Sequence, residues 1–332
     1  MFIVENYGLA IILCVITMLC WGSWANTTKL TSKTWRFELF YWDYGIGILI
    51  TTLLLAFTLG SSGSGGRGFL TDLNQADTSN LISALIGGVI FNLANILLVA
   101  AIGIAGMSVA FPVGIGIALV LGVIVNYASN PQGDPILIFG GVTLIAIAII
   151  LNARAYQKLQ TNTEGGVSKK GLILSVVSGC LMGLFYKYVA GSMVTNFNIP
   201  ETGKLTPYTA LVIFAVGIVI SSFVFNTIQM KRPFSGAPVS FADYFKGLAK
   251  DHLIGIFGGV IWCLGMSLSI IASGKAGPAV SYGLGQGATV VAAIWGIYVW
   301  KEFDKAPKGT KPLLNIMLLL YLSGLAMIIL SL

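Results

Sequence analysis

Three amide side chains occur in the middle of long apolar segments, where polar groups are rare. Asn92 and Asn95 lie three residues apart and would share one face of a helix, and Gln286 lies in a later apolar segment. A buried amide without a partner is costly, so each needs another helix, water or a solute. Amides both donate and accept hydrogen bonds, as hydroxyl and amide groups of small polar molecules require. The three residues are predicted either to bind such a solute or to join helices.

Aromatic residues extend this candidate binding site. Trp21 and Trp24 lie near the end of the first apolar segment, and Tyr282 lies close to Gln286. An aromatic face can stack on a sugar or a heterocycle, whereas the alternatives are an interfacial belt for the tryptophans and helix packing for the tyrosine. The predicted substrate-binding residues are therefore Asn92, Asn95, Gln286, Trp21 and Tyr282.

Two ionisable residues lie within apolar segments and are candidates for proton coupling. They are Asp43, in the sequence Tyr-Trp-Asp-Tyr, and Lys187, between two tyrosines. A carboxylate partly removed from water can exchange a proton near neutral pH. The alternatives are an ion pair of Asp43 with Lys29, Lys33 or Arg36, and a Lys187 side chain that extends to the outer interface.

Neither enzyme chemistry nor a bound metal or cofactor is predicted. His252 is the single histidine, the four cysteines have no CxxC spacing, and neither HExxH nor GxSxG occurs. Glycine-rich runs such as 283–287 lack the Lys-Ser or Lys-Thr of a phosphate-binding loop. They indicate close helix packing or, alternatively, a helix loosened beside a cavity.

The composition places these residues in membrane-spanning helices. Hydrophobic residues make up 56% of the chain and charged residues 9%, against roughly 25% charged residues in soluble domains. The apolar runs predict an all-α integral membrane protein in a lipid bilayer, with about ten transmembrane helices. They lie near residues 7–25, 39–60, 81–103, 107–128, 136–153, 171–192, 208–228, 253–273, 277–300 and 313–332.

The distribution of basic residues predicts the orientation. Of the 19 Lys and Arg residues, nearly all lie after the odd-numbered spans, whereas Arg67, Lys204 and Lys275 lie on the opposite side. Because cytoplasmic loops are enriched in Lys and Arg, both termini are expected outside the cell, and a bacterial inner membrane is the expected location. Membrane topology accounts for the charge, so nucleic acid is not an expected partner.

An internal repeat organises the spans. Residues 87–127 match residues 258–298 without a gap, an offset of 258 − 87 = 171, and share their Gly-Gly, Ala-Gly and Gly-x-Gly positions. Two five-helix repeats are therefore predicted, one at 1–160 (spans 1 to 5) and one at 161–332 (spans 6 to 10). An odd number of spans inverts the second copy, and inverted repeats commonly enclose a midplane site with alternating access.

Several motifs resemble the drug/metabolite transporter superfamily, in the branch of rhamnose/proton symporters, glucose/ribose porters and ureide permeases. The resemblance implies ten helices in two inverted five-helix repeats, and sugars or neutral nitrogen-rich metabolites as substrates, often taken up with protons. The matching motifs are Trp21 to Trp24, Tyr41 to Tyr44, Gly87-Gly88 with Asn92 to Asn95, Gly106-Met107-Ser108, Gly114 to Ile117, Lys169-Lys170-Gly171 and Lys301-Glu302-Phe303.

The function predicted from residues and resemblance together is secondary active import of a small neutral polar metabolite. A monosaccharide is the first candidate substrate, and proton symport is a further hypothesis. The alternative is a nucleobase or ureide permease, followed by a drug or metabolite exporter and a membrane receptor that transports nothing. The sequence patterns set no oligomeric state.

Overall fold

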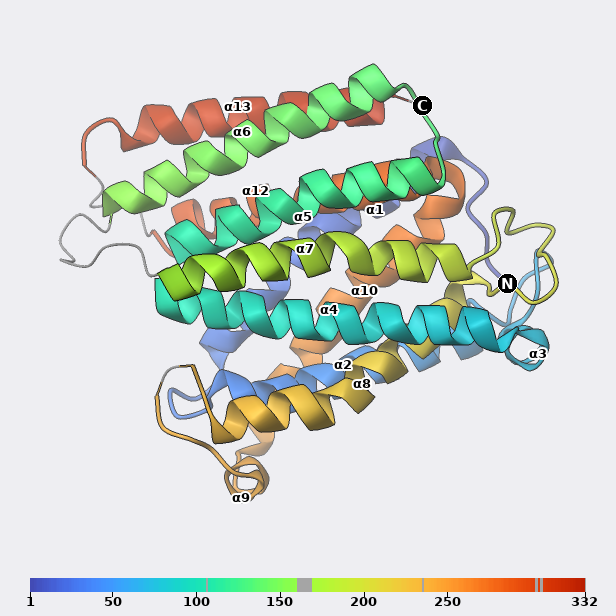
Figure 1. Cartoon of the computed structure of the whole chain (residues 1–332), viewed down its shortest axis with the longest axis horizontal. Coiled ribbons are helices and arrows are strands. Elements are labelled where there is room, and N and C mark those ends of the chain that lie inside the picture. The colour runs from blue at the N-terminus through green and yellow to red at the C-terminus, as the bar shows by residue number, and fades with distance from the viewer. Residues whose placement is uncertain (106, 160–168, 235, 302–303, 305–306, 332) are drawn as a thin grey trace.

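The computed structural model describes the chain except residues 106, 160–168, 235, 302–303, 305–306 and 332. Its described part is almost entirely helical and contains no β-strand, only one isolated bridge between Met193 and Leu205. The long helices run side by side, with the N- and C-terminal ends of the chain towards the same end of the bundle (Figure 1).

The long helices correspond to the predicted spans. By length and composition, nine elements of the described chain are able to cross a membrane, and Val113–Ser129 adds a shorter apolar helix. The prediction of an all-α membrane protein is confirmed. The elements are α1 (Tyr7–Ser23) continued by η1 (Trp24–Leu30), α2 (Phe37–Phe57), α4 (Thr78–Ala105), α5 (Met107–Ser129), α6 (Pro135–Leu159), α7 (Lys169–Ser192), α8 (Pro207–Lys231), α10 (Ala249–Ala276), α11 (Pro278–Gly285), α12 (Ala288–Ile294), the π-helical turn η2 (Trp295–Val299) and α13 (Thr310–Ile329).

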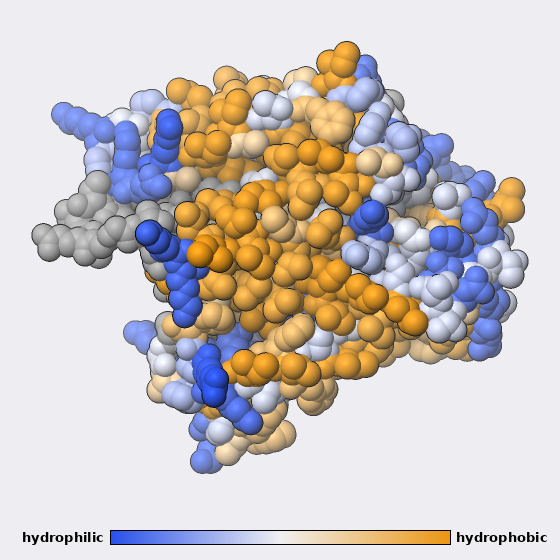
Figure 2. Space-filling model, in the orientation of Figure 1, coloured by the Kyte–Doolittle hydropathy of each residue, from blue (hydrophilic) through white to orange (hydrophobic). Residues whose placement is uncertain are grey.

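Apolar side chains cover the outside of the bundle. Figure 2 shows them across the middle of one face, with hydrophilic residues gathered at both ends. Large residues such as Ile220, Phe223 and Leu319 are more than half exposed, at 57%, 62% and 66%. An apolar surface of this extent requires a lipid environment, so the chain is a membrane protein.

Two pairs of helices cross in close contact at glycines. Gly259 on α10 meets Gly47 and the Tyr44 carbonyl of α2, and Gly88 on α4 meets Gly217 and the Phe214 carbonyl of α8. A Cβ atom on Gly259 or Gly88 would overlap those carbonyl oxygens. The two glycines are equivalent positions of the internal repeat, so the same small residue permits the same close crossing. The predicted boundary between 160 and 161 lies outside the described residues.

Short elements close the end of the bundle at which the chain begins. The short helix α3 (Phe69–Gln75) carries Asp72, which is fully buried. Arg67 Nε lies 2.7 Å from Asp72 Oδ1, while the backbone N–H and hydroxyl of Thr206 donate to Asp72 Oδ2 at 2.7 and 2.9 Å. Arg67 also donates to the Lys204 carbonyl at 2.8 Å. This Asp72 junction (Arg67, Asp72, Lys204, Thr206) joins the segment before α4 to the segment before α8.

The predicted span 277–300 is interrupted. It forms α11, α12 and η2 in turn, and Gln286 and Gly287 separate the first two helices. Local turns bridge the break, since the Gln286 N–H donates to the Tyr282 carbonyl and the Gly287 N–H to the Leu284 carbonyl. Interrupted spans occur where the backbone is covered by protein or borders a cavity, and this break places the Gln286 side chain at a cavity.

Candidate functional site

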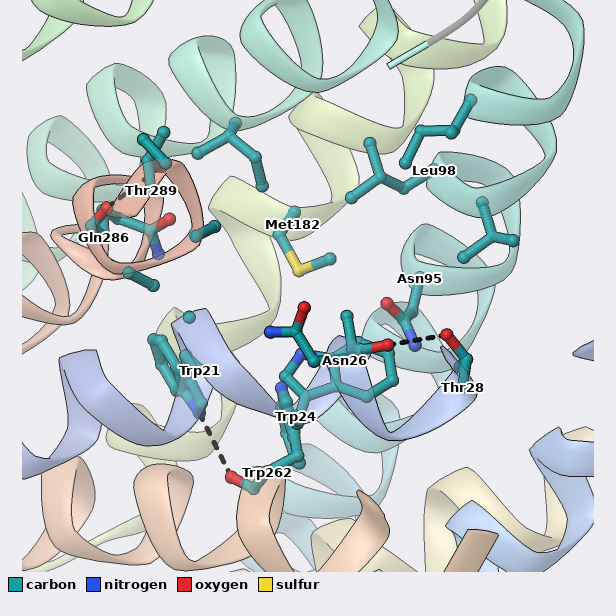
Figure 3. Close-up of a pocket in the computed structure, with 18 of the residues that line it drawn as sticks. Trp21, Trp24, Asn26, Thr28, Asn95, Leu98, Met182, Trp262, Gln286 and Thr289 are labelled. Carbon is teal, nitrogen blue, oxygen red and sulfur yellow. Dashed lines mark hydrogen bonds between the residues drawn. The ribbon is translucent and has the colours of Figure 1, made fainter. Parts of the chain in front are cut away.

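A cavity of ≈ 360 Å³ lies inside the bundle, between α1, α4, α6, α7, α10 and the interrupted span (Figure 3). Its size is within the range of small-molecule sites, about 300 to 1,000 Å³. The lining residues Ala25, Lys29 and Trp300 are exposed and lie together at one end. Lys29 Nζ lies 4.2 Å from the centre of the Trp300 ring. The mouth of the cavity is therefore at these residues, away from the Asp72 junction.

Tryptophans form one wall of the cavity. Trp21 and Trp262 lie nearly parallel, with ring centroids 6.1 Å apart and an interplanar angle of 12°. Trp21 Nε1 donates to the Trp262 carbonyl at 3.2 Å, which holds the first ring in place (Figure 3). Trp24 lines the same wall and packs on Tyr44 with centroids 4.8 Å apart. Such a wall offers flat apolar faces to a ring-shaped solute.

Aromatic residues also close the inner end of the cavity. Phe91 lies one helical turn beyond Asn95 on α4, and its ring centroid is 4.4 Å from that of Trp262 and 5.2 Å from that of Phe185. Phe214 packs behind Phe91 at 5.7 Å. All four side chains are buried. They lie between the cavity and the Asp72 junction and close the cavity on that side.

The two asparagines of α4 lie in different surroundings. Asn95 lines the cavity and donates from Nδ2 to the Tyr41 hydroxyl at 3.2 Å. Asn92 is fully buried and does not line the cavity. Its Oδ1 accepts from the Tyr41 hydroxyl at 2.8 Å, and its Nδ2 donates to the Ser221 hydroxyl at 2.8 Å and the Ile218 carbonyl at 3.2 Å. Asn92 therefore joins α4 to α2 and α8.

The other predicted binding residues divide in the same way. Trp21 and Gln286 line the cavity, and Figure 3 shows Gln286 across the cavity from Asn95. Tyr282 lies outside the cavity lining and is fully buried. Its hydroxyl donates to the Met182 carbonyl at 3.0 Å, which ties α11 to α7.

Several lining residues were missed by sequence reasoning. Trp262 lies in the middle of its span rather than at an interface, which was a usable signal for a site. Asn152 lies two residues from Arg154 near the end of a span and resembles an ordinary interfacial residue. Thr289 follows the helix break and donates to the Gln286 carbonyl at 3.3 Å. Only the folded arrangement brings Asn152 to the cavity.

Asp43 lies in a separate polar cluster on α2. His252 Nδ1 is 3.0 Å and 3.1 Å from the two carboxylate oxygens, and the Tyr244 hydroxyl donates to Oδ1 at 2.6 Å. The alternative of an ion pair between Asp43 and Lys29, Lys33 or Arg36 is not found in the described chain. Asp43 lies beside His252, and Arg36 pairs with Glu38 at 2.6 Å.

Tyr244 contributes a hydroxyl donor to the Asp43 cluster. It lies on the short helix α9 (Phe241–Phe245), outside the membrane-spanning segments. Burial, and then the hydrogen bond to Asp43, raise the pKa of Tyr244 well above its ordinary value. The hydroxyl therefore keeps its proton and donates a hydrogen bond to the carboxylate.

Lys187 lies apart from both polar regions. Its side chain is exposed on α7, five residues before the helix ends at Ser192, and it does not line the cavity. The structure thus brings Trp21, Asn95 and Gln286 together and leaves Asn92, Tyr282, Asp43 and Lys187 outside the cavity.

Comparisons with known proteins follow the whole length of the chain. The sequence model of one family, described as "Sugar transport protein", matches residues 12–332. Ureide permease 4 of Arabidopsis thaliana is 23% identical over 100% of this chain and 99% of the relative, and Ureide permease 2 of that plant is 24% identical over the same shares. Glucose uptake protein GlcU of Bacillus subtilis (strain 168) is 26% identical over 67% of this chain and 69% of the relative.

A solved crystal structure is similar in fold. It superposes with a TM-score of 0.59 over 96% of this chain and 95% of that chain, at 13% sequence identity. At this identity the likeness concerns the arrangement of the helices alone.

Proposed function

The chain belongs to the sugar transport protein family, and from that premise we propose that it is a secondary transporter of a small neutral polar metabolite. One observation carries the proposal: a membrane-embedded cavity lined by tryptophans and amides, with exposed lining residues at one end and packed aromatic rings at the other. A solute enclosed there crosses the bilayer when the other end opens. The chain thus moves its substrate rather than transforming it.

A monosaccharide is the substrate that we propose first. Indole faces suit the C–H faces of a sugar, and amides suit its hydroxyl groups. Among the described lining residues Lys29 alone carries a charge, and it lies at the mouth, so the inner cavity favours a neutral molecule. Trp21, Asn95 and Gln286 are the residues assigned to bind it.

A ureide is the second candidate substrate. The relatives that align over nearly their whole length are named ureide permeases, whereas the glucose uptake protein aligns over about two thirds. A planar ureido group also fits against an indole face and pairs with side-chain amides.

Uptake by proteoliposomes tests the function and separates the two substrates. Purified full-length protein should accumulate labelled D-glucose in a saturable way, with competition by unlabelled glucose and none by allantoin or uracil. Chromatography of the recovered label should find unchanged sugar. Saturable uptake of labelled allantoin without uptake of labelled glucose would establish the ureide candidate, and transport of neither would remove the proposed substrates.

Proton symport is proposed through the Asp43 cluster. A carboxylate held by a histidine and a tyrosine hydroxyl can take up and release a proton as α2 and α10 separate. The same two helices carry Tyr41, which bonds to Asn95, and Trp262 of the cavity wall, so their movement would alter the binding site. Asp43→Asn should abolish accumulation while leaving exchange of bound sugar. Uptake that persists after the proton gradient collapses would contradict coupling.

We further propose that alternating access follows from inverted repeats at 1–160 and 161–332. Both termini would lie outside the cell, and the mouth of the cavity would face the cytoplasm of a bacterial inner membrane. Single cysteines at Ser62 and Lys308, in a chain without its native cysteines, provide the test. A membrane-impermeant reagent applied to intact cells should label the first and spare the second.

A further inference from the structure

Asn152 on α6 contains a buried oxygen without a hydrogen-bond donor. The residue is 5% exposed, and its Oδ1 has no partner in the described chain. An acceptor left in this state is energetically costly, so such groups in native proteins usually bind water or a ligand. Because Asn152 also lines the cavity, a molecule in the cavity is able to supply the missing donor.

The other cavity amides also present side-chain oxygens that accept no hydrogen bond from the described chain. Within the described chain, Asn95 uses its Nδ2 atom for Tyr41 while its Oδ1 accepts nothing. Gln286 forms its hydrogen bonds through its backbone, whose carbonyl accepts from Thr289 and Tyr321 at 3.3 and 2.9 Å. Three side-chain oxygens from separate spans are therefore available to a solute.

Several other donors around the cavity are already used. The Thr28 hydroxyl donates to the Ala25 carbonyl at 2.7 Å, and Trp300 Nε1 donates to Asn26 Oδ1 at 2.7 Å. Trp21 Nε1 is used in the same way by the Trp262 carbonyl. No hydrogen bond from the side-chain N–H groups of Gln286 or Asn152 to the described chain is found, so these amides offer donors beside their acceptors. The polar part of the cavity therefore suits a molecule with hydroxyl or ureido groups, which bring both donors and acceptors.

We infer that Asn152 is a specificity-determining residue that accepts a hydrogen bond from an O–H or N–H group of the transported solute. The inference rests on the proposed function and makes it more specific. The ligand class is a neutral molecule with several adjacent donors, as in polyhydroxylated rings and ureido compounds. Asn152 selects against analogues that lack the donor facing α6, since their binding leaves its oxygen unpaired.

Stability without ligand distinguishes this role from a structural one. In purified full-length protein, Asn152→Leu should unfold at the same temperature as the parent or a higher one, because no bond is lost and a buried acceptor is removed. Asn92→Leu is the reference, since it removes several buried bonds and should lower the unfolding temperature. If Asn152→Leu were as destabilised as Asn92→Leu, Asn152 would be structural and the inference overturned.

Binding of analogues tests the contact itself. Calorimetric titrations use D-glucose with its five monodeoxy analogues, and allantoin with its N-methyl derivatives. In the series that binds, one analogue should have about ten-fold lower affinity than the full ligand for the parent protein, as expected for one lost hydrogen bond. For Asn152→Leu, the same analogue and the full ligand should have equal affinity. Asn126→Leu is the matched control, because Asn126 is buried but bonds to its own helix and does not line the cavity.

The outcomes separate the two proposals. If every analogue loses the same affinity for the parent and for Asn152→Leu, the role of Asn152 is overturned while the proposed transport function stands. If the parent binds neither glucose nor allantoin, the proposed substrates fail, and the unfolding comparison still decides whether Asn152 is structural.

Discussion

The cavity and the Asp72 junction both contain polar side chains, but their hydrogen bonding differs. In the junction, the two Asp72 oxygens receive Arg67 and Thr206 at 2.7 to 2.9 Å, and the carboxylate is fully buried. In the cavity, the oxygens of Asn95 and Asn152 accept nothing from the described chain. Polar groups that satisfy one another hold elements together, whereas unsatisfied ones are available to a solute.

Removing the centre of the junction should have the largest effect. Asp72→Ala leaves the Arg67 charge and the Thr206 N–H without their partner, which typically costs about 3 to 5 kcal/mol for a buried ion pair. Thermal unfolding in detergent should show a large fall in melting temperature. Glu5→Ala, at an exposed position, is the control. An unchanged melting temperature for Asp72→Ala would remove the distinction between junction and cavity.

Substitution of the glycines at the two helix crossings should give the next largest loss of stability. Gly88→Ala and Gly259→Ala each place a methyl group against a carbonyl oxygen of the neighbouring helix, and overpacking of this kind costs about 1 to 3 kcal/mol. The two losses in stability should be similar, because the positions are equivalent in the repeat. Gly45→Ala is a matched control on α2, where a Cβ meets nothing within 4 Å. A loss at one crossing alone would contradict the equivalence.

The two asparagines of α4 allow residues that join helices to be compared with residues that bind the solute. Asn95→Leu should raise the KM for uptake about ten-fold through loss of one contact to the solute, with a small change in melting temperature. Asn92→Leu should instead lower the melting temperature, because it breaks bonds to Tyr41 and Ser221. Uptake kinetics and unfolding are measured on both variants. A raised KM for Asn92→Leu together with a lowered melting temperature for Asn95→Leu would contradict this assignment.

Lys187 should give the smallest effect. Its side chain is exposed and outside the cavity, so Lys187→Gln should leave the KM, the maximal uptake rate and the dependence on a proton gradient unchanged. A loss of proton-driven accumulation in this variant would instead assign coupling to α7.

The helices themselves were predictable because their signals are local. Apolar runs long enough to cross a bilayer located all the spans, and small residues repeated at a constant offset located Gly88 and Gly259. The break at Gln286 was only partly indicated, since glycine-rich segments serve packing as often as they interrupt a helix.

Sequence alone determined the membrane-spanning class, the approximate positions of the spans and a small set of intramembrane polar residues, because these depend on properties of contiguous residues. Tertiary structure decided which of those residues meet. Residues three apart on a helix point in directions about 60° apart, and that rotation places Asn95 at the cavity and Asn92 against α8. His252 and Asp43 are 209 residues apart in sequence, and Asn152 reaches the cavity from another span. Such partners depend on how whole helices cross and rotate, and no local pattern encodes that geometry.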